Sequence, residues 1–140
     1  MPTVERLLGS VSVKARPLHH IALGTSHVET LAQFYEQAVG LERFKIHHEN
    51  DGRSIRSIWL RAGEVVVMIE RTTEGERVAR HSLISGWSTL VFSGTPDDAQ
   101  LLAIKEFGGK PEGQTDYTRY FRDPDGNRFG ISHYDFDGVP

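Results

Sequence analysis

The feature that most constrains this chain is a strand–turn–strand layout that occurs twice. Near the C-terminus, two runs rich in aromatic and branched residues flank a Pro-Asp-Gly-Asn turn within residues 120–134. Pro124 fixes its own φ, and Gly126 accepts the positive φ that closes a tight turn. Residues 57–70 repeat the order of an aromatic residue, an apolar residue, an Arg, a Gly turn and a β-rich run. Because internal repeats dictate architecture, the sequence predicts two copies of one unit.

Each copy also contains one segment with helical periodicity. Leu31, Phe34, Tyr35 and Ala38 fall on one face and predict a helix over 28–39 that ends at Gly40, opened by a capping box of Ser26 and Glu29. A second helix is predicted from about Pro96 to Gly108. Strands are predicted at 19–24, 41–49, 54–61 and 64–71, and again at 87–93, 110–115 and in the closing hairpin. Each copy is therefore a βαβββ unit.

These elements divide the chain into four parts. Residues 1–17 are an N-terminal arm, in which 4–8 could form a helical turn and 11–13 a short strand. The arm could lie against a partner subunit or be a frayed terminus. The two βαβββ modules span 18–71 and 86–135, and a polar connector at 72–85 joins them. Together the modules form one domain over residues 18–135.

Composition excludes several classes of function. The chain has no cysteine, so it has no disulfide, thiolate nucleophile or Cys-ligated zinc. Its net charge of -3 and pI near 6.1 give no general attraction to nucleic acid. The longest apolar runs, such as 65–69, are far shorter than the roughly 20 residues that cross a bilayer, and no signal peptide is evident. We expect a cytoplasmic protein with neither nucleic acid nor membrane as partner.

Two short motifs add a family resemblance. His-Ile-Ala-Leu occupies residues 20–23, and Phe-Arg-Asp-Pro-Asp-Gly-Asn occupies 121–127. With the duplicated βαβββ order, these motifs resemble the vicinal oxygen chelate superfamily over about residues 18–135. That superfamily includes glyoxalase I, methylmalonyl-CoA epimerase, extradiol dioxygenases, fosfomycin resistance enzymes and bleomycin resistance proteins. The resemblance implies an α+β fold of curled mixed sheets around a cleft, with helices outside, and a homodimer with clefts between units or subunits.

The resemblance also implies four metal-ligand positions, a His on the first strand and a Glu on the last strand of each unit. His20 matches the first position, whereas Trp87 stands at the second His position. Gly130 stands at the second Glu position, and aligning the turn glycines sets Val67 at the first. With one of four positions retained, we expect no metal cofactor.

An alternative keeps a divalent metal ion. Glu70 could join His20, but its strand parity is that of Val66 and Met68, which are expected to face the helix. A shift of one residue would reverse that facing. The other potential donors are non-standard histidines: His47, His48, His81 and His133. His47 and His48 are neighbours on one strand, so their side chains point to opposite faces unless the strand is bulged.

The substituted positions predict an apolar, aromatic and roomy cleft. Val65, Val67, Thr89 and Val91 are predicted to line its floor, and Arg56, Arg119 and Arg128 are available to an anionic group. The candidate ligand-binding residues are His20, Trp59, Val67, Trp87, Thr89, Tyr120 and Gly130. Trp87 would supply a flat stacking surface. The structural alternative is that these aromatic residues simply fill the core.

Three functions follow from this cleft. The leading hypothesis is a protein similar to bleomycin resistance proteins, which binds a small planar or hydrophobic molecule, with or without an anionic group, and uses no catalytic metal. The alternative is a metal-dependent glyoxalase-like lyase or isomerase, or a dioxygenase-type enzyme, using His20 with Glu70 or a non-standard histidine. Whether the chain is an enzyme stays open, and His20 is the candidate acid–base residue. A third possibility is a structural or interaction subunit.

Overall fold

A computed structural model describes residues 5–8, 11–72 and 88–138 of the chain. The first four-stranded sheet has the order β3-β6-β5-β4, and the second has the order β7-β10-β9-β8. In each sheet the first pair (β3–β6 or β7–β10) is parallel and the others are antiparallel. The strands are β3 (His20–Thr25), β4 (Glu42–His48), β5 (Ile55–Ala62), β6 (Val65–Arg71), β7 (Leu90–Ser93), β8 (Lys110–Gln114), β9 (Thr118–Arg122) and β10 (Arg128–Ser132). The predicted α+β fold with two mixed sheets is confirmed, and the sheets are not closed into a barrel.

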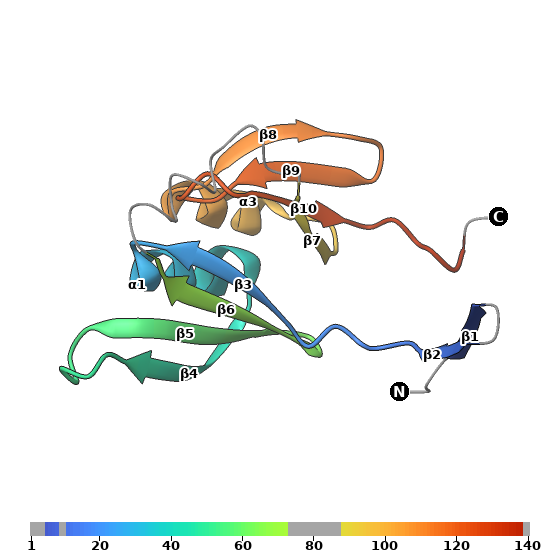
Figure 1. The fold of residues 1–140 in the computed structure, drawn as a ribbon. Coiled ribbons are helices and arrows are strands. Elements are labelled where there is room, and N and C mark those ends of the chain that lie inside the picture. Colours follow the sequence, from blue (N-terminus) through green and yellow to red (C-terminus); the bar gives the residue numbers. More distant parts are fainter. Residues whose placement is uncertain (1–4, 9–10, 73–87, 139–140) are drawn as a thin grey trace.

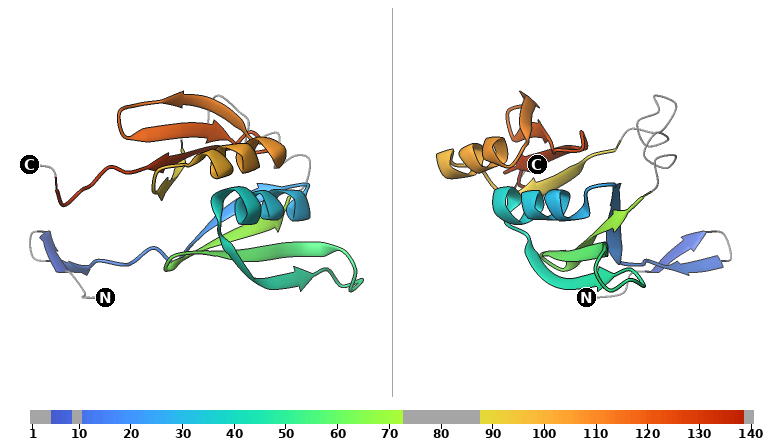
Figure 2. Two further views of the ribbon diagram at one scale, coloured as in Figure 1. Left: turned by 180° about the vertical axis from the view of Figure 1, so that it is seen from behind. Right: turned by 90° about the vertical axis from the view of Figure 1, so that its left-hand side faces the viewer.

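The helices lie between the two sheets, which Figure 1 shows one above the other. The helical segments are α1 (Val28–Phe34), the π-helix η1 (Tyr35–Val39) and α3 (Asp98–Glu106). The left-hand view of Figure 2, seen from behind, also shows these helices between the two sheets. Side chains from the helices and from both sheets form one core: Leu31, Phe34, Tyr35, Ile58, Leu60, Val67, Ile69, Ile104, Phe121, Phe129 and Ile131. Each sheet therefore has an inner face toward the helices and an outer face away from them.

The first helix covers the predicted range but begins and ends differently from an ordinary α-helix. Its last turn is a π-helix, and Gly40 ends it with φ at 94°. The predicted capping box is wrong, because His27 is the N-cap and makes no side-chain capping hydrogen bond. Glu29 instead pairs with Arg43 on β4, at 3.0 Å. The carboxylate of Glu29 therefore forms an ion pair with Arg43 and does not cap the helix.

Gly109 lets the two helical regions pack closely. A Cβ atom there would lie 2.7 Å from Cγ2 of Ile104 and 2.8 Å from Cε1 of Phe34. Upstream, α3 starts two residues later than Pro96, with Asp97 as N-cap accepting a hydrogen bond from the Gln100 amide. The end of α3 therefore packs against the first helical region so closely that no side chain fits at position 109.

A buried hydrogen bond ties η1 to the second sheet. The Tyr35 hydroxyl donates to Oδ2 of Asp123 at 2.7 Å. Asp123 also accepts from the backbone amides of Asp125 and Asn127, at 2.9 Å each, and from the Asn127 side-chain amide at 2.8 Å. Burial raises the pKa of Asp123, and burial together with Asp123 raises the pKa of Tyr35 well above its usual value. The turn after β9 is therefore fixed to the first helical region.

The N-terminal arm is a hairpin of β1 (Glu5–Leu8) and β2 (Val11–Lys14), which pair only with each other. The predicted helical turn at 4–8 is therefore wrong, whereas the strand at 11–13 is confirmed. The hairpin projects from the body of the molecule in Figure 1. Beyond Thr72, the predicted connector lies outside the described residues. No helix in the described ranges is both long and apolar enough to cross a bilayer.

Candidate functional site

Strand register assigns the side chains of the first sheet to its two faces. His20 pairs with Val66, and Gly24 pairs with Glu70, on the parallel strands β3 and β6. Val67 is 1% exposed and lies in the core, so it faces inward. Residues of the opposite parity face outward, and Glu70 is exposed there. Glu70 and His20 consequently share the outer face of the first sheet, while Val67 does not.

The second sheet identifies the true counterpart of Gly130. Gly130 pairs with Val91, and the alignment of the two first strands sets Val91 on Gly24. Glu70, which pairs with Gly24, therefore corresponds to Gly130. The predictions that Val67 holds this position and that Glu70 faces the helix are wrong. The turn between the last two strands has two residues in the first sheet and five in the second, so aligning the turn glycines misplaced the strand by three residues.

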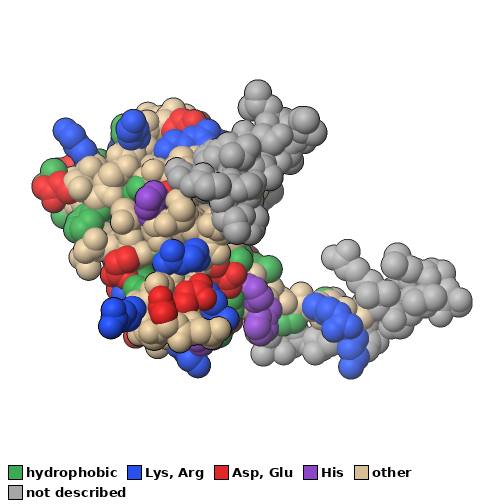
Figure 3. Space-filling model, turned by 60° about the vertical axis from the view of Figure 1, so that its left-hand side comes forward, with side chains coloured by type: hydrophobic (Ala, Val, Ile, Leu, Met, Phe, Trp, Pro, Cys, Tyr) green, Lys and Arg blue, Asp and Glu red, His purple; other side chains and the backbone are tan. Residues whose placement is uncertain are grey.

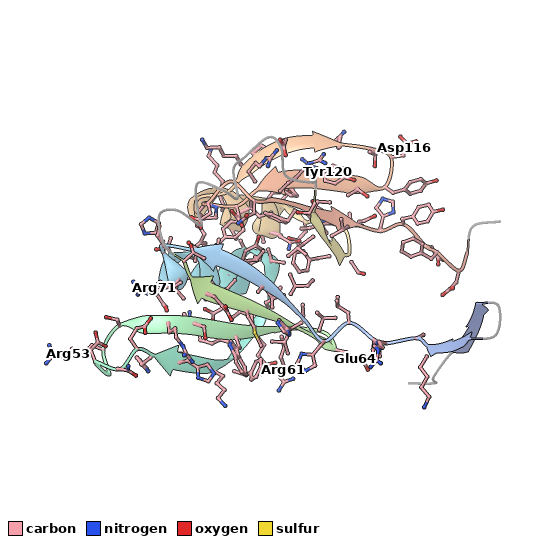
Figure 4. All side chains as sticks on the ribbon, in the orientation of Figure 1. Arg53, Arg61, Glu64, Arg71, Asp116 and Tyr120 are labelled. Carbon is pink, nitrogen blue, oxygen red and sulfur yellow. The ribbon has the colours of Figure 1, made fainter. Side chains whose placement is uncertain are left out.

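The space predicted beside Gly130 is filled by its neighbours on the outer face of the second sheet. A Cβ atom on Gly130 would lie 3.1 Å from Cδ1 of Tyr120 and 3.1 Å from Cγ2 of Thr118. The Arg128 guanidinium carbon lies 4.0 Å from the Tyr120 ring centroid. Figure 4 shows Tyr120 on this upper sheet. The expectation of an open corner is therefore wrong, because the tyrosine ring covers the glycine across the strand pair.

The outer face of the first sheet carries a row of three rings, here called the aromatic ladder: Phe44, Trp59 and His47. The ring centroids of Phe44 and Trp59 are 6.1 Å apart, and those of His47 and Trp59 are 4.5 Å apart. A register shift in β4 between Arg43 and Lys45 breaks the strict alternation of sides. Phe44 and Lys45 therefore both reach Trp59, a grouping that strand parity alone does not predict.

Two cations lie on the aromatic ladder. The Lys45 ammonium is 5.5 Å from the Trp59 ring centroid, and the Arg61 guanidinium carbon is 4.1 Å from that of Phe44. Figure 4 shows Arg61 below the lower sheet, away from the helices. Over the described ranges, neither cation forms an ion pair with an acidic side chain. The arginine predicted for an anion at 128 is instead paired with Glu112 at 3.2 Å.

Two ring nitrogens on the aromatic ladder have no hydrogen-bond partner among the described residues. They are Nε1 of Trp59 and Nε2 of His47, and both atoms are buried. A buried polar group without a partner costs about 1–3 kcal/mol. This face therefore holds hydrogen-bonding capacity that the described part of the chain does not use.

A separate apolar cavity of about 600 Å³ lies between the two sheets. The four predicted floor residues, Val65, Val67, Thr89 and Val91, all line it. Thr89 also donates its hydroxyl to the Arg128 carbonyl oxygen at 3.1 Å. The predicted site is thus divided: these four residues meet in the cavity, His20 and Trp59 lie on the outer face of the first sheet, and Tyr120 and Gly130 lie on that of the second. Trp87 and His81 lie outside the described residues.

Comparison with known proteins decides the family. Residues 17–131 match the model of the Glyoxalase/Bleomycin resistance protein/Dioxygenase superfamily. The chain belongs to this superfamily. No curated protein matches the sequence. Several solved structures nevertheless share the fold of this chain.

Three of these structures show the extent of the likeness. Fosfomycin resistance protein FosX from Mesorhizobium loti is 14% identical, with a TM-score of 0.63, over 88% of this chain and 95% of that chain. FosX from Listeria monocytogenes, in complex with Mn(II) and sulfate, is 15% identical, with a TM-score of 0.66, over 88% and 96%. A glyoxalase family protein from Enterococcus faecalis is 21% identical, with a TM-score of 0.60, over 84% and 97%. At these identities the likeness shows the fold alone.

The described residues do not complete the metal site that the superfamily implies. His20 and Glu70 retain donors on one outer face, but they lie about 13 Å apart along the strands. The position of Gly130 is covered by Tyr120. In the part of the chain that the structure describes, no three or more His, Cys, Asp or Glu side chains form a group suited to a metal ion.

The candidate acid–base residue, His20, is exposed at the start of β3. Its Nδ1 lies 2.8 Å from Nδ1 of His19, so one ring donates to the other. Of the other histidines, His133 is exposed and contacts the ring of Tyr117. A register shift between His47 and His48 does occur, the condition under which both could turn to one face.

Proposed function

We propose that this superfamily member binds a small planar or hydrophobic organic molecule on the outer face of its first sheet and uses no catalytic metal. The observation that carries the proposal is the aromatic ladder, which offers the flat surface of Trp59 beside unused ring nitrogens. Aromatic faces with a few directed polar groups are typical of sites for small organic ligands. The cavity between the sheets has a suitable volume, but its Thr89 hydroxyl is already engaged.

The proposal includes a homodimer. The outer faces of the two sheets lie on opposite sides of the chain, with the helices between them (Figure 1). A second copy could place the outer face of its second sheet, with Tyr120, over the first sheet of its partner. Such a pairing would enclose the ligand between subunits. Trp87 stays a predicted contact from that second sheet.

The proposed setting is the cytoplasm, with no nucleic acid or membrane as partner. The absence of cysteine is compatible with a reducing compartment. On the face shown in Figure 3, acidic and basic side chains are interspersed, and the net charge is -3. A surface of this kind supports no attraction to a polyanion. The two modules at 18–71 and 86–135 are proposed to act as one domain.

Metal analysis and a ligand screen test this proposal. Protein purified without a metal-affinity tag is expected to hold less than one tightly bound divalent ion per ten chains. In a thermal-shift screen of aromatic compounds, Trp59→Ala should abolish the stabilisation that a ligand gives to the wild type. Phe136→Ala removes another aromatic ring, 87% exposed and outside the ladder, and should leave the stabilisation unchanged. Full stabilisation of Trp59→Ala would contradict the proposal.

A second candidate function is a metal-dependent enzyme, and one observation favours it. Glu70 shares the outer face with His20, so half of the superfamily's ligand positions keep a donor. FosX from Listeria monocytogenes is described in complex with Mn(II). One divalent ion per chain, lost in both His20→Ala and Glu70→Ala, would replace the first proposal with this one. No reaction is assigned to either candidate.

A further inference from the structure

We infer that the ligand of the first sheet's outer face is a planar molecule that carries a carboxylate, held by Lys45 and Arg61 with its ring on Trp59. The inference rests on the proposed function and names the chemical class of its ligand. It depends on two observations within the described ranges: Lys45 and Arg61 have no acidic partner, and two buried ring nitrogens have no hydrogen-bond partner. Both lie on the aromatic ladder.

The charges around the aromatic ladder support an anion at one end of it. Lys45 and Arg61 both lie over ladder rings, at 5.5 Å and 4.1 Å. Glu42 is opposite Arg61 in the strand register, yet the two side chains do not form an ion pair. Glu70 lies across from Ser57, toward the other end of β5. The two positive charges are therefore available to a carboxylate beside Trp59.

The unpartnered ring nitrogens select an acceptor. The Trp59 indole has only a donor, at Nε1, and this atom has no partner. Nε2 of His47 has none either, and it too donates in the tautomer protonated there. An ionised carboxylate accepts at both oxygens and donates at neither. It therefore suits both nitrogens, whereas a ligand with only donors would leave the indole N–H unsatisfied.

A ligand ring that stacks on the indole of Trp59 has to displace Lys45. Both nitrogens are covered by protein atoms, and the Lys45 ammonium lies over the Trp59 ring. The lysine side chain is long and exposed, so it can swing aside at low energetic cost. Its charge would then meet the carboxylate while the ring of the ligand takes its place on the indole. A flat aromatic ring matches that surface better than a branched aliphatic one.

Isothermal titration of two matched probes into the full chain tests the inference. The probes are 2-naphthoate and its neutral amide, 2-naphthamide, at pH 7.5 and low salt. The naphthoate is expected to bind at least tenfold more tightly than the amide, because charge-assisted hydrogen bonds are about twice as strong as neutral ones. Arg61→Gln and Lys45→Gln should each weaken naphthoate binding about five- to tenfold, and Trp59→Phe, which keeps a ring but lacks the N–H, about fivefold.

The control is Arg53→Gln, which removes the same charge from the exposed turn at the far end of the sheet (Figure 4). It should leave naphthoate affinity unchanged, and circular dichroism verifies that each variant is folded. Equal affinity for the two probes would overturn the inference while leaving the proposed function in place. Loss of affinity in Arg53→Gln as large as in Arg61→Gln would also overturn it. If neither probe binds, the inference fails, and the thermal-shift screen decides the proposed function separately.

Discussion

The hydrogen bond between Tyr35 and Asp123 should hold the first helical region against the second sheet, and Tyr35→Phe tests this. Both residues are buried, and the hydroxyl and carboxylate oxygens are 2.7 Å apart. The substitution removes one oxygen and keeps the ring, so it opens no sizeable cavity in the core. The expected cost is that of one hydrogen bond to a charged group, about 2 kcal/mol in the free energy of unfolding.

Urea denaturation followed by circular dichroism measures that cost. The variant should unfold at a lower urea midpoint with an unchanged slope, because the surface exposed on unfolding is the same. Its melting temperature should fall by about 6–10 °C for a chain of this size. Tyr134→Phe, at an exposed position near the C-terminus, is the control and should change the free energy by less than about 0.5 kcal/mol.

Equal stability of Tyr35→Phe and the Tyr134→Phe control would show that this hydrogen bond does not hold the first helical region against the second sheet. In that case the remaining donors to Asp123, from Asp125 and Asn127, would be sufficient for the carboxylate. The relative placement of the two sheets would then depend on apolar packing alone.

Three further outcomes are expected. Burial raises the pKa of Asp123 above its unfolded value of about 4. The stability linked to this group is therefore fully present below that pH and is lost as the pH rises through the folded pKa. In urea titrations at successive pH values, the stability advantage of the wild type over Asp123→Asn should shrink across that window. Gly109→Ala should cost about 1–3 kcal/mol, since a Cβ would meet Phe34 and Ile104, and Gly113→Ala, with open space around it, should cost less than about 0.5 kcal/mol in the same assay. Gly130→Ala should also destabilise the chain, by about 1 kcal/mol, unless the Tyr120 ring moves aside, which a change in tyrosine fluorescence would report.

The sequence was sufficient to predict the duplicated fold, because its strongest signals are local. Leu31 and Phe34 repeat at helical spacing, and the turn around Gly126 has the residues that a tight turn requires. The structure contains the helix and the turn that these patterns predict, and their ends differ from the prediction by only a residue or two. The inward facing of Phe129 and Ile131 was also predictable, since both belong to one strand with a clear apolar alternation.

The candidate binding face was harder to predict, because it depends on register between strands. The two-residue turn before Val65 moved Glu70 to the outer face, and a glycine alignment cannot detect a difference in turn length. The register shift near Phe44 and Lys45 is likewise invisible in a pattern of alternating residues. The filling of the space at Gly130 depends on a tyrosine ten residues away in sequence, across the strand pair.

NMR spectroscopy can map where a ligand binds on the chain. Amide and indole NMR shifts are recorded while 2-naphthoate is added to protein treated with a chelator. We expect the largest changes at the Trp59 indole N–H and at His47 and Lys45, without any added metal. Changes centred on Val65 and Val91, which line the cavity between the sheets, or changes that require added Mg²⁺ or Zn²⁺, would contradict a metal-free site on the aromatic ladder.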